Sequence, residues 1–160
     1  MFLSFNNKSY LILSVSLVVL LIQSNLPSVV VYNNNRINLD LVLVFLTSLV
    51  FLRNSYKIII IGFTYGLIQD LIMGVDQLGV FSFIKSSAVF LLLYVRQYDT
   101  IWDRKTKLLY VFLIYFIHFT LYYSIIYNEF YFIILSISLF QTISTFILFI
   151  LFKNLFIKIK

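Results

Sequence analysis

Six long apolar runs follow one another along the chain, separated by short segments rich in Asn, Lys, Arg or Gly. A transmembrane helix needs about 20 mainly apolar residues, within a range of about 17–25, to cross the hydrocarbon core of a bilayer. The pattern therefore predicts an all-α integral membrane protein, in which residues 1–160 form a single bundle of about six transmembrane helices. The predicted helices are Tyr10–Leu26, Ile37–Leu52, Ile58–Met73, Leu78–Val95, Leu108–Tyr127 and Phe130–Phe152.

The first run is longer than the apolar core of a signal peptide, which is about 7–15 residues, and no A-x-A-like cleavage site follows it. We therefore expect a retained helix that ends before Pro27. The second and third runs are the shortest. An alternative for these two runs is a hairpin of two helices that does not fully span the membrane.

The distribution of Lys and Arg predicts that both chain ends are cytoplasmic, because short cytoplasmic loops carry an excess of these residues. With a cytoplasmic N-terminus, only Arg36 falls in an outer loop, and Lys85 lies within a helix. The other ten of the 12 basic residues fall on the cytoplasmic side: Lys8, Arg53, Lys57, Arg96, Arg104, Lys105, Lys107, Lys153, Lys158 and Lys160. Several tyrosines and Trp102 near the helix ends fit an interfacial aromatic belt.

Composition supports a membrane protein and narrows the chemistry. The chain is 62% hydrophobic and 11% charged, whereas soluble domains contain about 25% charged residues. The sequence contains no Cys, which excludes disulfides, thiolate metal sites and thiol nucleophiles. The net charge of +6 does not indicate nucleic-acid binding, because the basic residues flank the apolar runs.

Each predicted helix carries one polar or ionisable side chain within or at the edge of its apolar run. These residues are Gln23, Asp40, Asp70, Lys85, His118 and Gln141. At a rise of about 1.5 Å per residue, all six lie at similar heights in the outer half of the membrane, which predicts a shared polar layer. Because an unpaired charge inside a membrane is costly, we expect Lys85 to pair with Asp70 or Asp40.

Three interpretations of this layer stay open: an internal network that fixes helix packing, a groove that faces a partner or ligand, and a proton or ion pathway. His118 is the only His, so hydrogen bonding within the bundle is expected rather than a metal site. Asp40 and Asp70 resemble a carboxylate pair, but neither lies in the Gly-Asp or Asn-Asp-Arg context of intramembrane enzymes. We therefore expect no enzyme activity, catalytic residue or cofactor.

Gly62 and Gly66 form a Gly-x-x-x-Gly motif, which lets helices approach closely. We favour packing within the chain over an interface between chains, and self-association is left open. Gly74 and Gly79 bracket a predicted outer turn, where the conformational freedom of glycine explains both residues.

Three stretches carry a family resemblance. Leu21–Pro27 ends the first predicted helix, Asn38–Leu43 opens the second, and Gly62–Val80 follows a Gly-Phe…Gly-Leu-x-x-Asp-Leu…Gly…Leu-Gly pattern. Together they resemble the rod shape-determining protein MreD family. The chain departs from that family at Phe81, where many members carry His, and Lys85 is not expected from it. The matching motif positions are Asp40, Gly66, Asp70 and Gly79.

The resemblance implies a non-enzymatic, multi-pass scaffold of the bacterial cytoplasmic (inner) membrane. Such a scaffold belongs to the cell-elongation complex and binds MreC, a bitopic protein. It helps couple MreB filaments to peptidoglycan synthesis and cell shape, with the rod-shape glycosyltransferase and its transpeptidase as indirect partners. The four matching residues would then shape the bundle or a partner interface.

An alternative from another class is the small-solute-binding membrane subunit of an energy-coupling-factor transporter, which also has six helices and a similar size. The polar layer would then be the substrate pocket. Against this, the first predicted helix lacks an Ala-x-x-x-Ala docking motif and has Ser14-Val15-Ser16 instead.

Overall fold

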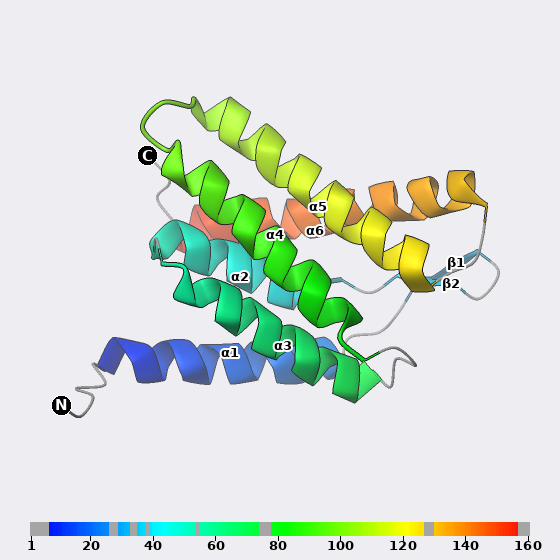
Figure 1. The fold of residues 1–160 in the computed structure, drawn as a ribbon, viewed down its shortest axis with the longest axis horizontal. Helices are drawn as coiled ribbons and strands as arrows, with labels where there is room; N and C mark the ends of the chain where they lie inside the picture. The colour runs from blue at the N-terminus through cyan, green and yellow to red at the C-terminus, as the bar shows by residue number, and fades with distance from the viewer. Residues whose placement is uncertain are drawn as a thin grey trace.

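The computed structural model describes residues 7–25, 29–32, 35–37, 39–53, 55–73, 78–126 and 130–156. Within these ranges the chain forms six α-helices, as the sequence predicts, and one antiparallel β-hairpin, which the sequence does not predict (Figure 1). The elements are α1 (Asn7–Asn25), β1 (Val29–Tyr32), β2 (Asn35–Ile37), α2 (Leu41–Leu52), α3 (Lys57–Met73), α4 (Val80–Gln97), α5 (Arg104–Ile126) and α6 (Tyr131–Phe156).

Three helices of the described chain are long and apolar enough to cross a membrane. The spanning stretches are Val80–Gln97 in α4, Arg104–Ile126 in α5 and Tyr131–Lys153 in α6. Two shorter apolar stretches, Val15–Asn25 in α1 and Leu41–Leu52 in α2, lie in the remaining helices. These features are those of a membrane protein.

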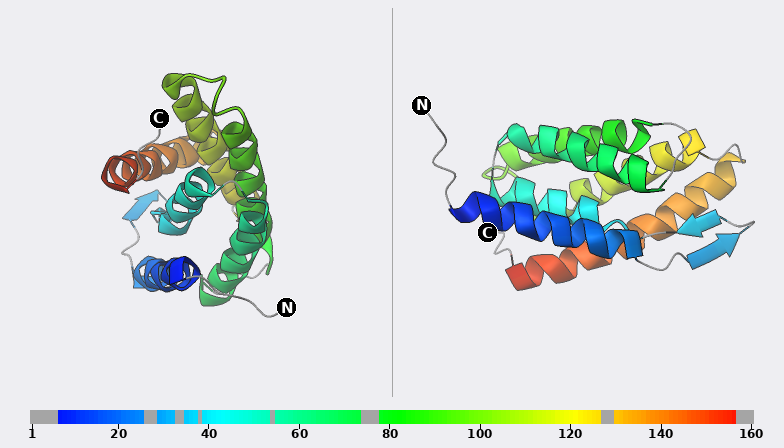
Figure 2. Two further views of the ribbon diagram at one scale, coloured as in Figure 1. Left: turned by 90° about the vertical axis from the view of Figure 1, so that its left-hand side faces the viewer. Right: turned by 90° about the horizontal axis from the view of Figure 1, so that it is seen from below.

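Helix α2 lies at the centre of the bundle, and the other helices surround it (Figure 2). It packs against α1, α3, α4 and α6, and nine of its 12 residues are buried. Twelve helical residues extend only about 18 Å, which is less than the hydrocarbon thickness of about 30 Å. A short helix is tolerated at membrane depth where protein surrounds it, and here neighbouring helices bury most of α2, while Leu52 at its carboxyl end is exposed.

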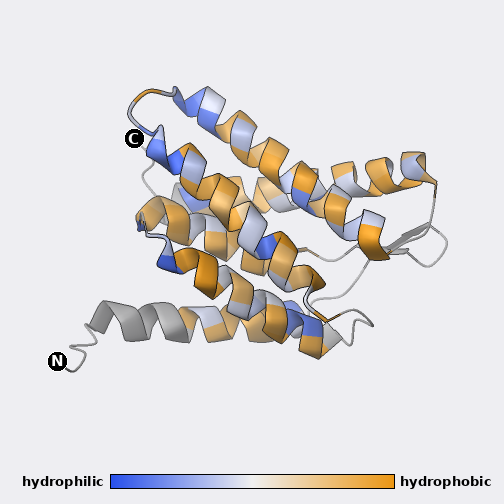
Figure 3. Ribbon diagram, in the orientation of Figure 1, coloured by the Kyte–Doolittle hydropathy of each residue, from blue (hydrophilic) through white to orange (hydrophobic). Residues whose placement is uncertain are grey.

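Seven basic residues of the described chain lie at or near the helix ends that meet at one end of the bundle, which we call the basic end. This end contains the start of α1, the end of α6 and the turns between α2 and α3 and between α4 and α5 (Figure 1). The hydrophilic ends of α4 and α5 are visible there, next to mostly apolar helix centres (Figure 3). The basic residues are Arg53, Lys57, Arg96, Arg104, Lys105, Lys107 and Lys153.

The second helix begins at Leu41, four residues later than the sequence predicts. Asp40 ends the preceding segment, because its side chain accepts a hydrogen bond from the N–H of Leu43 at 2.9 Å and caps the helix. Before it, β2 pairs with β1 in the register Val29↔Ile37, consistent with the strand preference of β-branched residues. Hydropathy alone merged the apolar Ile37 with the helix that follows.

Helices α3 and α4 form the most extensive helix pair, and the Gly-x-x-x-Gly motif of α3 faces α4 of the same chain. A Cβ atom on Gly66 would lie 2.4 Å from the Cα of Ser82, and one on Gly62 would lie 3.1 Å from Val89 Cγ2. Only glycine allows this approach at Gly66. Gly79, before α4, has a φ of +101°; Gly74 lies outside the described residues.

Candidate functional site

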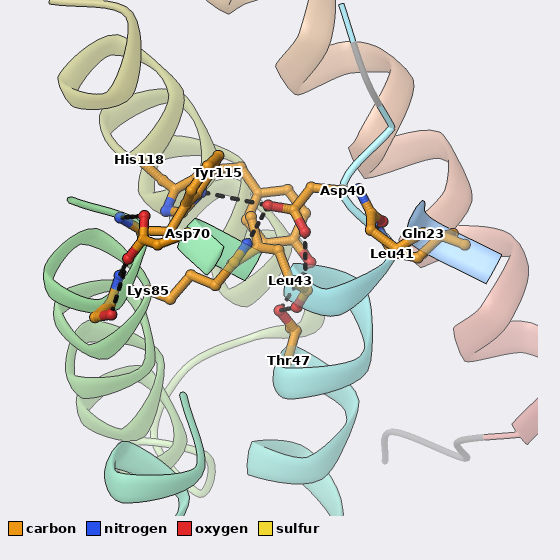
Figure 4. Close-up of polar contacts among 11 residues, drawn as sticks. Gln23, Asp40, Leu41, Leu43, Thr47, Asp70, Lys85, Tyr115 and His118 are labelled. Atoms are coloured by element: carbon orange, nitrogen blue, oxygen red, sulfur yellow. Dashed lines mark hydrogen bonds and ion pairs between the residues drawn. The ribbon is translucent and has the colours of Figure 1, made fainter. Parts of the chain in front are cut away.

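A buried carboxylate, Asp40, lies at the amino end of the central helix α2 (Figure 4). Its Oδ1 accepts the hydrogen bond from the Leu43 N–H, and its Oδ2 forms an ion pair with Nζ of Lys85 on α4. The Lys85 side chain is fully buried. A helix amino terminus has unpaired N–H groups and a partial positive charge. The carboxylate is thus held by a helix end and a lysine together.

Helix α5 contributes two further side chains beside this pair (Figure 4). Nε2 of His118 lies 3.6 Å from Oδ2 of Asp40. One turn earlier, the Tyr115 hydroxyl lies 2.8 Å from Oγ1 of Thr47 on α2. Because the Thr47 hydroxyl donates its proton to the Leu43 carbonyl at 2.8 Å, Tyr115 is the donor in this contact. We call Asp40, Lys85, His118, Tyr115 and Thr47 the charge cluster.

The charge cluster is buried, and its ion pair joins opposite charges, the ammonium of Lys85 and the carboxylate of Asp40. The ammonium of Lys85 also lies 5.5 Å from the ring centroid of Phe81, a favourable cation–π distance. Such a buried pair is stable only with good geometry and additional hydrogen bonds, and the helix amino terminus supplies one of these bonds. Nδ1 of His118 has no hydrogen bond to any described residue.

Asp70, the other partner predicted for Lys85, has a different role. It is fully buried near the end of α3 and accepts hydrogen bonds from the N–H groups of Gly79 and Phe81, both at 3.0 Å. The N–H and hydroxyl of Ser82 approach the same carboxylate at 3.4 and 3.1 Å. Gly79, the residue before α4, has no side chain for a cap. Asp70 therefore supplies the cap from the neighbouring helix, and Lys85 pairs with Asp40 alone.

The two predicted glutamines lie in separate contacts. Oε1 of Gln23 accepts a hydrogen bond from the N–H of Leu41 at 2.7 Å, which ties α1 to the start of α2 beside Asp40. Gln141 on α6 bonds the hydroxyl of Tyr123 on α5. The predicted layer thus divides into three groups: the charge cluster with Gln23 beside it, the Asp70 cap, and the α5–α6 pair.

Sequence reasoning missed Thr47 and Tyr115 because it considered mainly charged and amide side chains. A positional signal was present. Thr47 follows Asp40 by seven residues and Tyr115 precedes His118 by three, so each shares a helix face with a predicted residue.

The chemistry available to the charge cluster is limited. Asp40 and His118 are its only potential metal ligands of the usual types, and no group of three His, Cys, Asp or Glu side chains forms a metal site among the described residues. Asp40 and Asp70 each accept hydrogen bonds from the start of a different helix, α2 and α4 respectively. The arrangement holds helices in place.

Comparison with protein-family models, curated proteins and solved structures gives no match to this chain. Function is therefore inferred from the residues and contacts described above.

Proposed function

We propose that the chain is a non-enzymatic scaffold of the bacterial cell-elongation complex, similar to the MreD family. In this proposal it crosses the bacterial cytoplasmic membrane six times and binds an MreC-like bitopic protein. It thereby helps couple MreB filaments to the peptidoglycan synthases. The proposal draws on the sequence resemblance and on the structural contacts of the residues that carry that resemblance.

The observation that carries the proposal is that all four matching motif residues hold helices together. Asp40 caps α2 and joins it to α4, Asp70 caps α4 from α3, and Gly66 lets α3 and α4 touch. Gly79 takes the positive φ that starts α4. Buried polar groups that are held by hydrogen bonds between helices make the packing of a core rigid and specific. Rigid faces suit a scaffold better than a pocket that opens and closes for a solute.

Co-purification tests this proposal, and the fold shows which variants are informative. Asp70→Leu is unsuitable for locating an interface, because it would remove the cap of α4. Single cysteines on the outer faces leave the buried contacts unchanged, and each is unique because the sequence has no Cys. Suitable exposed positions on four helices are Leu71, Phe83, Leu121 and Phe140.

We expect C-terminally tagged protein, extracted in mild detergent, to recover an MreC-like bitopic protein and cell-wall synthases. A photoreactive maleimide on the single cysteines is expected to crosslink that bitopic protein from one or two adjacent helices. The positions on the remaining helices are the matched controls. Recovery of ATP-binding-cassette subunits, or of a bound vitamin, would overturn the scaffold proposal and favour the transporter subunit.

The six-span topology gives a separate prediction. Thr100 lies in the α4–α5 turn at the basic end, and Leu78 lies just before α4 at the opposite end; both are exposed. In spheroplasts, a membrane-impermeant maleimide is expected to label Leu78→Cys directly but Thr100→Cys only after permeabilisation. The reverse labelling pattern would show that the protein has the opposite orientation in the membrane. Equal labelling of both cysteines would contradict a spanning α4.

A further inference from the structure

The turn between α4 and α5, at the basic end, is ordered by contacts of its own. The N–H of Ile101 donates to the Tyr98 carbonyl at 3.0 Å. The carboxylate of Asp99 pairs with both Arg96 and Lys107, and Nζ of Lys107 also donates to the Asp99 carbonyl at 2.7 Å. Hydrogen bonds and ion pairs therefore fix the turn to the end of α4 and to the first turn of α5.

Ring stacking and a contact with the α2–α3 turn add to this order. The ring of Trp102 stacks on Tyr98 and on Tyr110, with centroids 5.0 and 4.5 Å apart. Nε2 of Gln97, at the end of α4, donates to the hydroxyl of Tyr56 in the α2–α3 turn at 2.8 Å. The two turns thus form one continuous surface. A surface that is already ordered loses less conformational entropy when it binds a partner.

This surface exposes apolar side chains outside the spanning stretches. Ile101 is 73% exposed and lies between the stretches that end at Gln97 and begin at Arg104. Tyr56, in the neighbouring turn, is 64% exposed. Figure 3 shows an apolar stretch in the α4–α5 turn, between the hydrophilic ends of the two helices. Apolar and aromatic groups presented by an ordered turn suit insertion into a pocket of a partner.

Exposed cations accompany these two side chains in both turns. They are Arg53, Lys57, Arg104 and Lys105. Among the described residues of the two turns, Asp103 is the only exposed carboxylate, since Asp99 is partly buried and already paired. Such a cationic surface repels a second copy of itself and is complementary to an acidic one.

We propose that the α2–α3 and α4–α5 turns form a docking surface for an acidic patch of a cytoplasmic protein, with Ile101 as the central apolar contact. The inference rests on the scaffold proposal, in which that protein is the MreB-like filament. The filament would then bind this chain directly, and not only through the bitopic protein. The positive charge of cytoplasmic loops in general accounts for the cations, but not for the ordered turn or the exposed Ile101.

Co-sedimentation with filaments tests this docking surface. The full chain is placed in phosphatidylcholine nanodiscs, which carry no net lipid charge and leave both ends of the protein accessible. The nanodiscs are then mixed with the purified, polymerised MreB-like protein. We expect loaded nanodiscs to sediment with the filaments and empty nanodiscs to stay in solution. Binding is expected to weaken as salt is raised, because salt screens the exposed charges.

Two variants test the apolar and the charged part of the surface separately. Ile101→Ser is expected to weaken binding about tenfold, a loss typical of a central interface residue. Its matched control is Leu78→Ser, which changes an aliphatic side chain of similar exposure, 67%, at the opposite end of the bundle. The control is expected to bind like wild type. Arg104→Gln with Lys105→Gln is expected to weaken binding at low salt and to reduce its salt dependence.

The outcomes separate this inference from the scaffold proposal. Loaded nanodiscs that sediment no better than empty ones would overturn the docking surface, and recovery of the bitopic protein would leave the scaffold proposal standing. Unchanged binding of Ile101→Ser would also overturn it. So would binding that requires phosphatidylglycerol and is equal for empty nanodiscs, because the filaments would then bind the lipid surface. Absence of both filament binding and the bitopic protein would overturn both proposals.

Discussion

Replacing Lys85 with methionine is expected to lower the free energy of unfolding by about 3–5 kcal/mol, the cost of removing one partner from a buried ion pair. Methionine keeps most of the apolar stem, so the change mainly removes the ammonium charge. Asp40 would remain buried, with Leu43 N–H and His118 as its described polar neighbours. The measurement is an unfolding titration in mixed micelles.

Lys57→Met is the control for this experiment, because Lys57 is an exposed lysine at the start of α3. Its loss is expected to change the free energy of unfolding by no more than about 0.5 kcal/mol. A similar small effect for Lys85→Met would contradict the assignment of Lys85 as the counter-charge of Asp40.

The double variant Lys85→Met with Asp40→Asn separates charge pairing from packing. Asparagine keeps an oxygen that can accept the Leu43 N–H bond and cap α2, but it carries no charge. We therefore expect the double variant to be more stable than Lys85→Met alone, because no uncompensated carboxylate remains. A double variant no more stable than Lys85→Met would contradict the cost assigned to the uncompensated carboxylate, and the Asp40→Asn single variant completes the cycle that gives the coupling energy.

The sequence predicted the helices well because each apolar run is long and bounded by polar residues. It predicted the start of α2 poorly, because the β2 residue Ile37 is as apolar as the helix that follows it. It also placed the start of the fifth helix at Leu108, whereas α5 begins at Arg104. Hydropathy marks the part of a helix that suits lipid, and charged first turns extend beyond that part.

The choice between Asp40 and Asp70 as the partner of Lys85 could not be made from the sequence. Counting residues along a helix gives the height of a side chain in the membrane, but neither the direction in which it points nor the residue beside it. Both carboxylates have the same predicted height. The decisive fact is local to α4, which begins at Val80 and whose N-cap residue, Gly79, has no capping side chain. Asp70 satisfies that helix start, which leaves Asp40 for Lys85.

The second large effect is expected from a single added methyl group, in Gly66→Ala. In an exposed helix, glycine to alanine stabilises by about 0.5–1 kcal/mol. Here the new Cβ would lie 2.4 Å from the Cα of Ser82 and 2.5 Å from its N, and neither backbone atom can rotate away. Overpacking typically costs about 1–3 kcal/mol, and occasionally more. We expect a destabilisation of about 3 kcal/mol, measured by the same titration.

Gly62→Ala is the matched control for Gly66→Ala, since both residues lie on the same face of α3. Its nearest neighbour would be Val89 Cγ2 at 3.1 Å, on a side chain that can shift, and the backbone oxygen of Lys85 at 3.6 Å is in ordinary van der Waals contact. We therefore expect a change of less than about 1 kcal/mol. Stability of Gly66→Ala equal to wild type would mean that α3 and α4 are farther apart than the structure places them.

The Gly66 effect also reaches the carboxylate cap, because the residue that blocks the added methyl group is Ser82. Ser82 donates both its N–H and its hydroxyl to Asp70, so moving α4 away from α3 stretches these bonds together with the close contact. Destabilisation by Gly66→Ala and by Asp70→Ala is thus expected to be less than additive, because both changes disrupt one contact region. Full additivity would show that the glycine contact and the cap stabilise the helix pair independently. It would contradict the single contact region between α3 and α4 on which the scaffold proposal rests.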